Sequence, residues 1–255
     1  MNDRAHRRKL GQNYLVDPVI LFEIERAINP QEKNSFFEIG PGAGALTKHL
    51  IGQNRTVLAM DLDKKNIDLL SKKFKDAHHK FLHGDVLKES LDFFSEKDYR
   101  VVGNLPYNIS TQIIFKLIRH FDNIQDLHFL VQKEVAQRIC NTGSSNHSGR
   151  LGVKIGALFN TAILFDVPPE SFDIKPKVQS AFIRMIPKTR PEINLDEFTE
   201  FSNLIDLSFS NKRKSIKNNL KKLGIDFKNF NINPLARAEE LAIEDFISIF
   251  RGIDQ

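Results

Sequence analysis

Short apolar runs alternate with helical patterns through the first half of the chain, and this alternation restricts the possible fold more than any other feature. The apolar runs are residues 35–40, 56–61, 80–85, 100–104 and 127–131. Helical patterns separate several of them, and Ser110 is expected to cap one such helix, as Asp17 is expected to cap an earlier one that begins at Pro18. Because strands that alternate with helices form right-handed crossovers, we expect an α/β fold with a mostly parallel sheet covered on both faces.

The pattern changes after residue 152. Residues 161–167 and 178–186 are two further strand-like runs, and no helix fits in the proline-containing segment that joins them. Consecutive strands without a crossover helix pair antiparallel, so the last strand of the sheet is expected to be antiparallel. A linker is predicted at residues 187–191, and helical patterns follow at 198–210, 212–223 and 243–250. We therefore expect a first domain over residues 1–187 and a small helical domain over residues 188–255.

Four of the predicted strands end in a residue that suits ligand binding: Gly40, Asp61, Asp85 and Asn104. Open parallel sheets bind ligands at the carboxyl ends of their strands, so these positions are expected to converge on one site. Gly40 and Gly42 belong to a turn with three glycines, which lets the backbone approach a ligand closely. The turn lacks the Lys-Ser/Thr pair of an ATPase phosphate loop, but it fits a dinucleotide-binding turn loosely, so a nicotinamide enzyme stays open.

Two carboxylates bear on the choice of cofactor. Asp61 follows the glycines by about 20 residues, where a carboxylate holds the ribose hydroxyls of either NAD or S-adenosylmethionine. Asp85, at the end of the third strand, suits a hydrogen bond to an adenine amino group. Together with the antiparallel last strand, Asp85 favours a methyltransferase over a dehydrogenase.

Residues 104–107, Asn-Leu-Pro-Tyr, are an unusual end for a buried strand and suit chemistry on the exocyclic amine of adenine. The lone pair of that nitrogen is delocalised into the ring, so an enzyme must draw the nitrogen towards tetrahedral geometry. The Asn104 side-chain oxygen and the Leu105 carbonyl are candidate acceptors for its two N–H groups. Pro106 keeps that carbonyl out of a strand ladder, and Tyr107 offers a face on which an extruded base stacks. These residues alone do not distinguish RNA adenine from DNA adenine.

These motifs resemble those of the KsgA-type ribosomal RNA adenine dimethyltransferases over nearly the whole chain. The resemblance is carried by residues 8–15, 38–42, 103–110, 132–135, 149–151, 168–169, 172, 176–178 and 212–216. It implies a Rossmann-like methyltransferase sheet and S-adenosylmethionine as cofactor, bound by Asn13, Leu15, Gly40, Gly42, Asp61, Asp85 and Asn104. It also implies dimethylation of two adjacent adenosines in the 3'-terminal hairpin loop of 16S rRNA, within the immature small ribosomal subunit.

The resemblance further implies that Phe172 stacks on the target adenine opposite Tyr107. From the residues alone, Phe172 is better explained as a core residue of its proline-containing loop. The sequence departs from the family at two positions, since Asp61 stands where Glu is common and Ile174 stands where a proline is common. The shorter Asp61 keeps both acceptor oxygens, and Ile174 leaves its loop less restrained.

The positive charge of the chain is unevenly distributed. The net charge is +5 and the pI about 9.2. Basic residues gather near both ends, and the candidates for RNA binding are Arg7, Arg8, Lys9, Lys212, Arg213, Lys214, Lys217 and Lys221. Two such clusters favour a polyanionic partner. On a helix over residues 212–223, Arg213, Lys217 and Lys221 would share one stripe beside an apolar one.

Composition narrows the remaining possibilities. Cys140 is the one cysteine, so no disulfide framework is possible, and no His/Cys cluster has the spacing of a metal site. No apolar run approaches the roughly 20 residues of a membrane span, and the basic N-terminus lacks the apolar core of a signal peptide. We expect a cytoplasmic, monomeric enzyme without a metal. Two alternatives stay open: a methyltransferase of large-subunit rRNA, and an assembly factor that binds the immature subunit without turnover.

Overall fold

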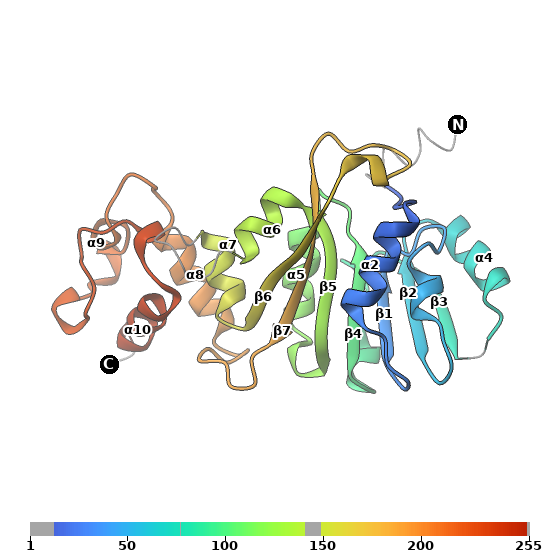
Figure 1. Cartoon of the computed structure of the whole chain (residues 1–255). Helices are drawn as coiled ribbons and strands as arrows, with labels where there is room; N and C mark the ends of the chain where they lie inside the picture. The colour runs from blue at the N-terminus through green and yellow to red at the C-terminus, as the bar shows by residue number, and fades with distance from the viewer. Residues whose placement is uncertain (1–12, 77, 141–148, 254–255) are drawn as a thin grey trace. The chain divides into compact units, whose positions relative to one another are not determined.

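The computed structural model describes residues 13–76, 78–140 and 149–253, and its main element is a seven-stranded sheet (Figure 1). The strands are β1 (Ser35–Ile39), β2 (Thr56–Asp61), β3 (His79–His83), β4 (Tyr99–Asn104), β5 (Ile124–Gln132), β6 (Phe159–Val167) and β7 (Ser180–Pro187). Their order in the sheet is β3-β2-β1-β4-β5-β7-β6. β1 to β5 pair in parallel and β7 pairs antiparallel with β5, so the predicted fold class is confirmed.

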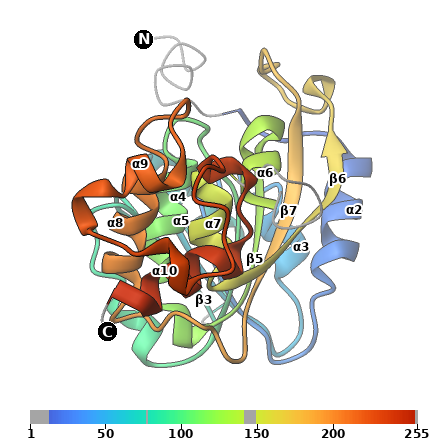
Figure 2. The same cartoon turned by 90° about the vertical axis from the view of Figure 1, so that its left-hand side faces the viewer.

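Neighbouring residues of a strand face opposite sides of the sheet. Phe36 of β1 lies in an apolar cluster with residues of α2 (Pro18–Ile28) and α3 (Thr47–Leu50). Phe37 points to the other side, where its ring centroid lies 4.9 Å from that of Phe93. Figures 1 and 2 show α2 and α5 on opposite faces of the sheet. The other α-helices that follow these strands are α4 (Lys64–Lys73), α5 (Ser110–Ile118) and α6 (Lys133–Cys140). Three short 3₁₀ helices, labelled η, lie between strands: η1 (Asp92–Ser95), η2 (Phe121–Asn123) and η3 (Pro169–Ser171).

The two predicted helix caps have different outcomes. Asp17 caps α2 as predicted, because its carboxylate accepts a 2.9 Å hydrogen bond from the backbone N–H of Val19. Ser110 is not a cap: it is the first residue of α5, and its hydroxyl donates to the Tyr107 carbonyl (3.3 Å). The backbone turn over residues 106–109 ends directly before α5, so Ile109 takes the N-cap position and the prediction for Ser110 is wrong.

A second compact unit combines residues 137–161 with the chain from residue 187 onward. Its helices are α7 (Arg150–Gly156), α8 (Phe198–Ser208), α9 (Ile216–Asn219), η4 (Lys221–Leu223), η5 (Phe227–Asn229), η6 (Ala238–Glu240) and α10 (Ile243–Ile253). Val153 of α7 is buried in one apolar cluster with Phe201 of α8 and Phe246 of α10. The sequence predicts a single division after residue 187, whereas this apolar contact groups residues 137–161 with the C-terminal helices.

The sequence predicts one helix over the basic segment of residues 212–223. The structure does not form it. Helix α9 covers only four residues, and Arg213 precedes it. The backbone N–H of Ile216 donates to the Ala236 carbonyl over 2.7 Å, so a contact distant in sequence replaces the helical bond of that residue. The predicted helical stripe of Arg213, Lys217 and Lys221 is therefore wrong, although all three residues are exposed.

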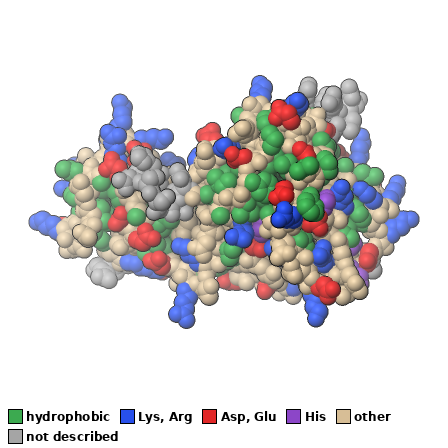
Figure 3. Space-filling model, in the orientation of Figure 1, with side chains coloured by type: hydrophobic (Ala, Val, Ile, Leu, Met, Phe, Trp, Pro, Cys, Tyr) green, Lys and Arg blue, Asp and Glu red, His purple; other side chains and the backbone are tan. Residues whose placement is uncertain are grey.

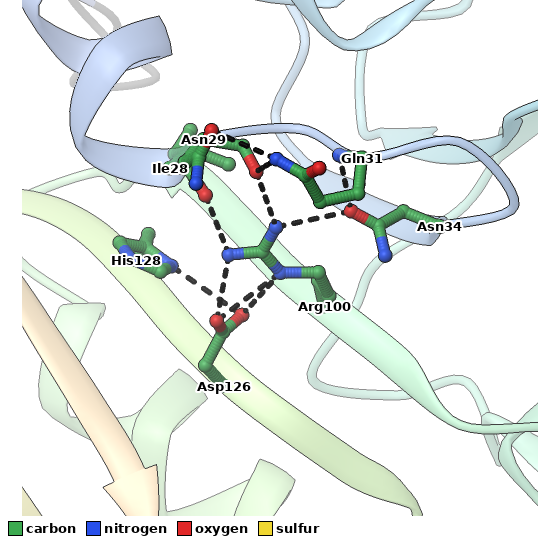
Figure 4. A network of polar contacts seen from close by, with 7 residues as sticks. All are labelled: Ile28, Asn29, Gln31, Asn34, Arg100, Asp126 and His128. Carbon is green, nitrogen blue, oxygen red and sulfur yellow. Dashed lines mark hydrogen bonds and ion pairs between the residues drawn. The ribbon is translucent and has the colours of Figure 1, made fainter. Parts of the chain in front are cut away.

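An ion pair between the buried Arg100 and the half-buried Asp126 joins β4 and β5 at the end of the sheet opposite the carboxyl ends of the parallel strands (Figure 4). The Arg100 guanidinium donates to both carboxylate oxygens of Asp126, the shortest contact being 2.7 Å, and to the Ile28 carbonyl (2.6 Å). His128 lies 3.4 Å from the same carboxylate. Burial acts to raise the pKa of Asp126, but the neighbouring His128 ring and the hydrogen bonds from Arg100 bring it below its ordinary value.

Within the described residues, no helix has both the length and the apolar character that crossing a membrane requires.

Candidate active site

A pocket lies at the carboxyl ends of β1, β2, β3 and β4, where the sequence predicts a binding site. Eight predicted site residues line it: Asn13, Gly40, Asp61, Asp85, Asn104, Leu105, Pro106 and Tyr107. The four strand ends singled out from the sequence therefore meet in one place. Leu15, Gly42 and Phe172 lie outside this lining.

The glycine turn brings backbone donors to the edge of the pocket. Gly40, Gly42 and Gly44 have positive φ values of 67°, 55° and 82°, a region that other residues rarely adopt. At Gly42 space is also limiting, because a Cβ atom would lie 2.9 Å from the ring of Tyr14. The Gly42 N–H donates to Oδ2 of Asp61 (3.0 Å), so the turn also holds a predicted cofactor ligand.

Asp61 is 3% exposed and accepts three hydrogen bonds. Its Oδ1 accepts from the Asp63 N–H (2.8 Å), and its Oδ2 accepts from the Gly42 N–H and from Asn66 Nδ2 (2.9 Å). Burial raises the pKa of Asp61 above its ordinary value, and these three donors oppose the shift because they favour the charged form.

Asp85 closes the turn that follows β3. Its Oδ1 accepts from the Leu87 N–H (3.0 Å), and its Oδ2 lies 3.7 Å from the ammonium group of the exposed Lys88. The carboxylate is partly exposed and lines the pocket beside Val86. Asp85 therefore has an oxygen available to a ligand, and its role in binding the cofactor stays a prediction.

Asn104 ends β4 with its amide held in one orientation. Its Nδ2 donates to the Asn13 backbone carbonyl over 2.7 Å. An amide carries its donors on nitrogen and its acceptor on oxygen, so this bond directs Oδ1 away from Asn13 as the acceptor of the group. Directly before it, a Cβ at Gly103 would lie 2.6 Å from the Ile39 carbonyl, so only glycine fits where β4 and β1 come together.

The next three residues leave the sheet in a turn. The Leu105 N–H donates to the Leu130 carbonyl (3.1 Å), while no described residue donates to the Leu105 carbonyl. Pro106 begins the turn, and its carbonyl accepts from the Ile109 N–H (3.2 Å). The Tyr107 hydroxyl is hydrogen-bonded to the Ser180 hydroxyl of β7, which fixes the tip of the ring.

The segment before α2 pairs with the loop between β6 and β7. Leu15 and Phe172 form an antiparallel bridge, and the Asp173 N–H donates to the Tyr14 carbonyl (3.0 Å). Leu15 and Phe172 are 5% and 3% exposed and belong to the apolar cluster beneath α2. The structure therefore buries Phe172 as a core residue, and it does not bring its ring to Tyr107.

Glu38 lies behind the pocket and is 1% exposed. It borders a second, largely apolar cavity together with Leu15, Leu46 and Phe182. Burial raises the pKa of Glu38 to about 8, and the nearby Asp61 carboxylate adds to this effect. The Glu38 carboxyl therefore keeps its proton at neutral pH.

The predicted RNA-binding residues fall in two groups. Arg7, Arg8 and Lys9 lie outside the described residues. The described candidates are exposed residues of the C-terminal unit: Lys212, Arg213, Lys214, Lys217 and Lys221. Figure 3 shows Lys and Arg side chains projecting from this unit. In the described part of the chain, no group of three or more His, Cys, Asp and Glu side chains is arranged to hold a metal ion.

With this geometry in place, the comparisons with known proteins give a family. A family model described as ribosomal RNA adenine dimethylase matches residues 3–255. The chain belongs to this family. Members of similar sequence include ribosomal RNA small subunit methyltransferase A of Neisseria meningitidis, 40% identical over 98% of this chain and 96% of the relative. The protein of the same name from Dechloromonas aromatica is 38% identical over 98% of each chain.

Two solved structures share the fold of this chain over most of its length. A dimethyladenosine transferase from Plasmodium falciparum superposes with a TM-score of 0.78 at 27% identity, covering 92% of this chain and 95% of the other. The 23S rRNA methyltransferase ErmE gives a TM-score of 0.75 at 22% identity, covering 95% and 100%. At that identity the second likeness shows the fold alone.

Three residues of the site are not among the predicted ones. Tyr14 lines the pocket, Asn66 contacts Asp61, and Ser180 contacts Tyr107. Tyr14 could have been found from its place directly after Asn13. Asn66 and Ser180 have no local signal, because one lies on a charged helix and the other begins an ordinary strand.

Proposed function

We propose that this chain transfers methyl groups from S-adenosylmethionine to the N6 amines of two adjacent adenosines in the 3'-terminal hairpin loop of 16S rRNA. The observation that carries the proposal is the Asn104 amide, whose nitrogen is engaged by the Asn13 carbonyl so that its oxygen is the acceptor. Membership of the ribosomal RNA adenine dimethylase family supports the reaction, and similarity to small-subunit methyltransferases supports the substrate.

The residues of the pocket fit S-adenosylmethionine. Asp61 keeps acceptor capacity on Oδ1 for a ribose hydroxyl, and Asp85 offers an oxygen to an adenine amino group. The backbone of Gly40 lines the pocket without a side chain in the way. When bound, the cofactor supplies a methyl group carried on a sulfonium sulfur.

The chain's own part in the reaction is to shape the target amine. The amine nitrogen becomes nucleophilic when its lone pair is withdrawn from conjugation with the ring. Two acceptors, Asn104 Oδ1 and the Leu105 carbonyl, would hold its two N–H groups out of the ring plane. Because both acceptors are fixed by the backbone around them, they lose little freedom when the amine binds, and the main contribution to the rate is positioning.

Aromatic side chains hold the base itself. The Tyr107 ring lines the pocket and is fixed through its hydroxyl, so it would stack on the adenine after the base leaves its own stack. We also propose that Phe172 stacks on the opposite face. This second contact requires its side chain to leave the apolar cluster in which it is 3% exposed.

The exposed basic residues of the C-terminal unit would bind the rRNA backbone. Contacts to phosphate position a nucleic acid without reading its sequence, so these side chains would orient the immature subunit and leave recognition of the adenosines to the pocket. The residues are Lys212, Arg213, Lys214, Lys217 and Lys221, and the segment with Arg7, Arg8 and Lys9 is proposed to join them.

Mass spectrometry of small-subunit rRNA from cells that lack this protein tests the proposal. We expect the paired dimethyladenosines to be absent and to return when the gene is restored. Their persistence without the protein would refute the proposed substrate. Methylation assays on purified small and large subunits provide the control, because preferential labelling of the large subunit would favour the alternative substrate.

A further inference from the structure

Asp61 is the end of a hydrogen-bond network that crosses three parts of the fold. Asn66 of α4 donates from Nδ2 to Asp61 Oδ2 (2.9 Å) and to the hydroxyl oxygen of Tyr14 (3.0 Å). Tyr14 lies in the segment before α2, 52 positions away from Asn66 in the sequence. Asn66 is 8% exposed, so these bonds are largely shielded from water.

We propose that Tyr14 and Asn66 are positioning residues that hold the Asp61 carboxylate in the orientation needed to bind the cofactor's ribose. This inference rests on the proposed function, because it takes Asp61 to be the ribose-binding carboxylate. Neither Tyr14 nor Asn66 is assigned contact with the reacting atoms.

The Asn66 amide lies between the Asp61 carboxylate and the Tyr14 hydroxyl. With Nδ2 towards Asp61, its two N–H groups have two acceptors, the carboxylate and the hydroxyl. The hydroxyl also lies 3.2 Å from Asn66 Oδ1, to which it can donate instead of accepting from Nδ2. A reversed amide would place its oxygen against the carboxylate oxygen, two acceptors that repel each other. The carboxylate therefore selects the donating orientation, and the Tyr14 hydroxyl restrains the amide from its other side.

The network leaves one oxygen of Asp61 available. Oδ2 accepts from Asn66 and from the Gly42 N–H, which occupies both of its lone pairs. Oδ1 accepts from the Asp63 N–H and has one lone pair left. The carboxylate is therefore prepared to accept a single ribose hydroxyl at Oδ1. Loss of the Asn66 donor would free Oδ2 and let the carboxylate turn away from that position.

The ring of Tyr14 has a separate role from its hydroxyl. A Cβ atom at Gly42 would lie 2.9 Å from Cε1 of this ring, so the ring covers the glycine turn. Tyr14→Phe removes the hydroxyl and keeps that cover. This substitution therefore isolates the hydrogen bond from the packing.

A double-mutant cycle between Tyr14 and Asp61 tests the proposal. Isothermal titration calorimetry would measure S-adenosylmethionine binding to the wild type, Tyr14→Phe, Asp61→Asn and the double variant. We expect Tyr14→Phe to weaken binding about 3- to 30-fold in the wild type and less than twofold beside Asp61→Asn, because coupled residues are non-additive. An equal loss in both backgrounds would overturn the inference.

A ligand comparison separates positioning from general loss of structure. With an S-adenosylhomocysteine analogue that lacks both ribose hydroxyls, Tyr14→Phe and wild type should bind equally. In steady-state assays the KM for S-adenosylmethionine should rise while kcat at saturation stays within about twofold. Asn66→Leu should show the same pattern, and a weakened analogue affinity in both variants would contradict the inference.

Tyr99→Phe is the matched control, since it removes the hydroxyl of a buried tyrosine at the start of β4, at the opposite edge of the sheet. Its affinity for S-adenosylmethionine should equal that of the wild type. If the wild type itself does not bind S-adenosylmethionine, the proposed function fails. If it binds and Tyr14→Phe binds equally well, only the role of Tyr14 fails.

Discussion

The Asn104 side chain donates a 2.7 Å hydrogen bond to the backbone carbonyl of Asn13, across 91 positions of sequence. A backbone carbonyl cannot be changed by substituting its own side chain, so the contact persists in most variants of residue 13. This contact fixes which end of the Asn104 amide faces Asn13, and no second polar side chain is needed to do so. The orientation of the acceptor is thus fixed by the path of the backbone before α2.

Asn104→Ala should lower methylation of the small subunit about 10²- to 10³-fold, the usual cost of removing one fixed electrostatic contact to a reacting group. Assays with purified small subunits would measure it. Asn108→Ala is the control, because Asn108 is exposed in the same turn and lies outside the pocket lining. Near-normal methylation by Asn104→Ala would contradict the mechanism. Normal subunit assembly in cells without methylation would show that binding is the main role.

Substitution can separate the hydrogen bond of the Tyr107 hydroxyl from the proposed stacking of its ring on the target base. Tyr107→Phe keeps the ring and removes only the hydrogen bond to Ser180, so kcat/KM for the rRNA substrate should fall less than about fivefold. Tyr107→Ala removes the stacking surface and should lower kcat/KM roughly 5- to 150-fold, corresponding to about 1–3 kcal/mol. Equal effects of the two variants would show that the ring face is not used.

Protonation of Glu38 should make the stability of the fold depend on pH. Its pKa is about 8 in the folded chain and near the ordinary 4.5 when unfolded. The contribution of Glu38 to the free energy of unfolding is complete below about pH 4.5, where the folded and unfolded chains both carry the proton. It is lost as the pH rises through 8, because between these two pKa values only the folded chain retains the proton. The free energy of unfolding should fall by at most about 1.4 kcal/mol per pH unit.

Urea denaturation at pH 5, 6, 7 and 8 would measure this slope. Glu38→Gln stays neutral throughout and should flatten it. Glu134→Gln, at an exposed position of α6, should leave it unchanged. A Glu38→Gln variant with the wild-type slope would show that another group is responsible.

The Arg100–Asp126 pair should be needed for stability and not for binding. Asp126→Ala leaves the buried guanidinium without its partner, which typically costs about 3–5 kcal/mol. Thermal and urea unfolding would measure the decrease in stability, and S-adenosylmethionine affinity should be unchanged at temperatures where the variant is folded. Asp122→Ala, at an exposed position of η2, is the control. A decrease below about 1 kcal/mol would contradict this role.

Replacing Arg213, Lys217 and Lys221 with Glu should weaken binding to the small subunit without affecting cofactor affinity. The slope of log K against log salt should also decrease, by roughly 0.7–0.9 for each rRNA phosphate that the variant no longer neutralises. Filter binding over a range of salt concentrations would measure both effects. The same change at Lys72, Lys73 and Lys75, basic residues on and beside α4, is the matched control. Unchanged subunit binding at moderate salt would refute the proposal.

The part of the candidate site that lies at the carboxyl ends of the strands could be predicted from the sequence. Gly40, Asp61, Asp85 and Asn104 are local features, and the rule that parallel strands end at one edge of the sheet brings them together. Tyr14 and Asn66 were not predictable as partners, because their contact joins segments 52 positions apart and depends on how α4 packs.

Local patterns failed where tertiary contacts compete with them. Residues 212–223 have helical periodicity, but the bond from Ile216 to the Ala236 carbonyl and the adjoining turns interrupt the helix. The grouping of α7 with α8 was likewise hidden, since an apolar helix near the middle of a chain does not reveal which later helix it will meet. Sequence periodicity reports which face is buried and leaves the partner of that face undetermined.

The position of β7 in the sheet has a consequence for the growing polypeptide. β7 is the last strand to be synthesised, yet it lies between β5 and β6. A ribosome-bound nascent chain therefore keeps one edge of β5 unpaired until about residue 187 has emerged, and unpaired edges invite association with other chains. The backbone partners of Tyr14 and Leu15 are also made late, at Phe172 and Asp173. The contacts that fix the segment of Tyr14 are thus completed late in translation, even though all the residues that line the pocket are synthesised in the first half of the chain.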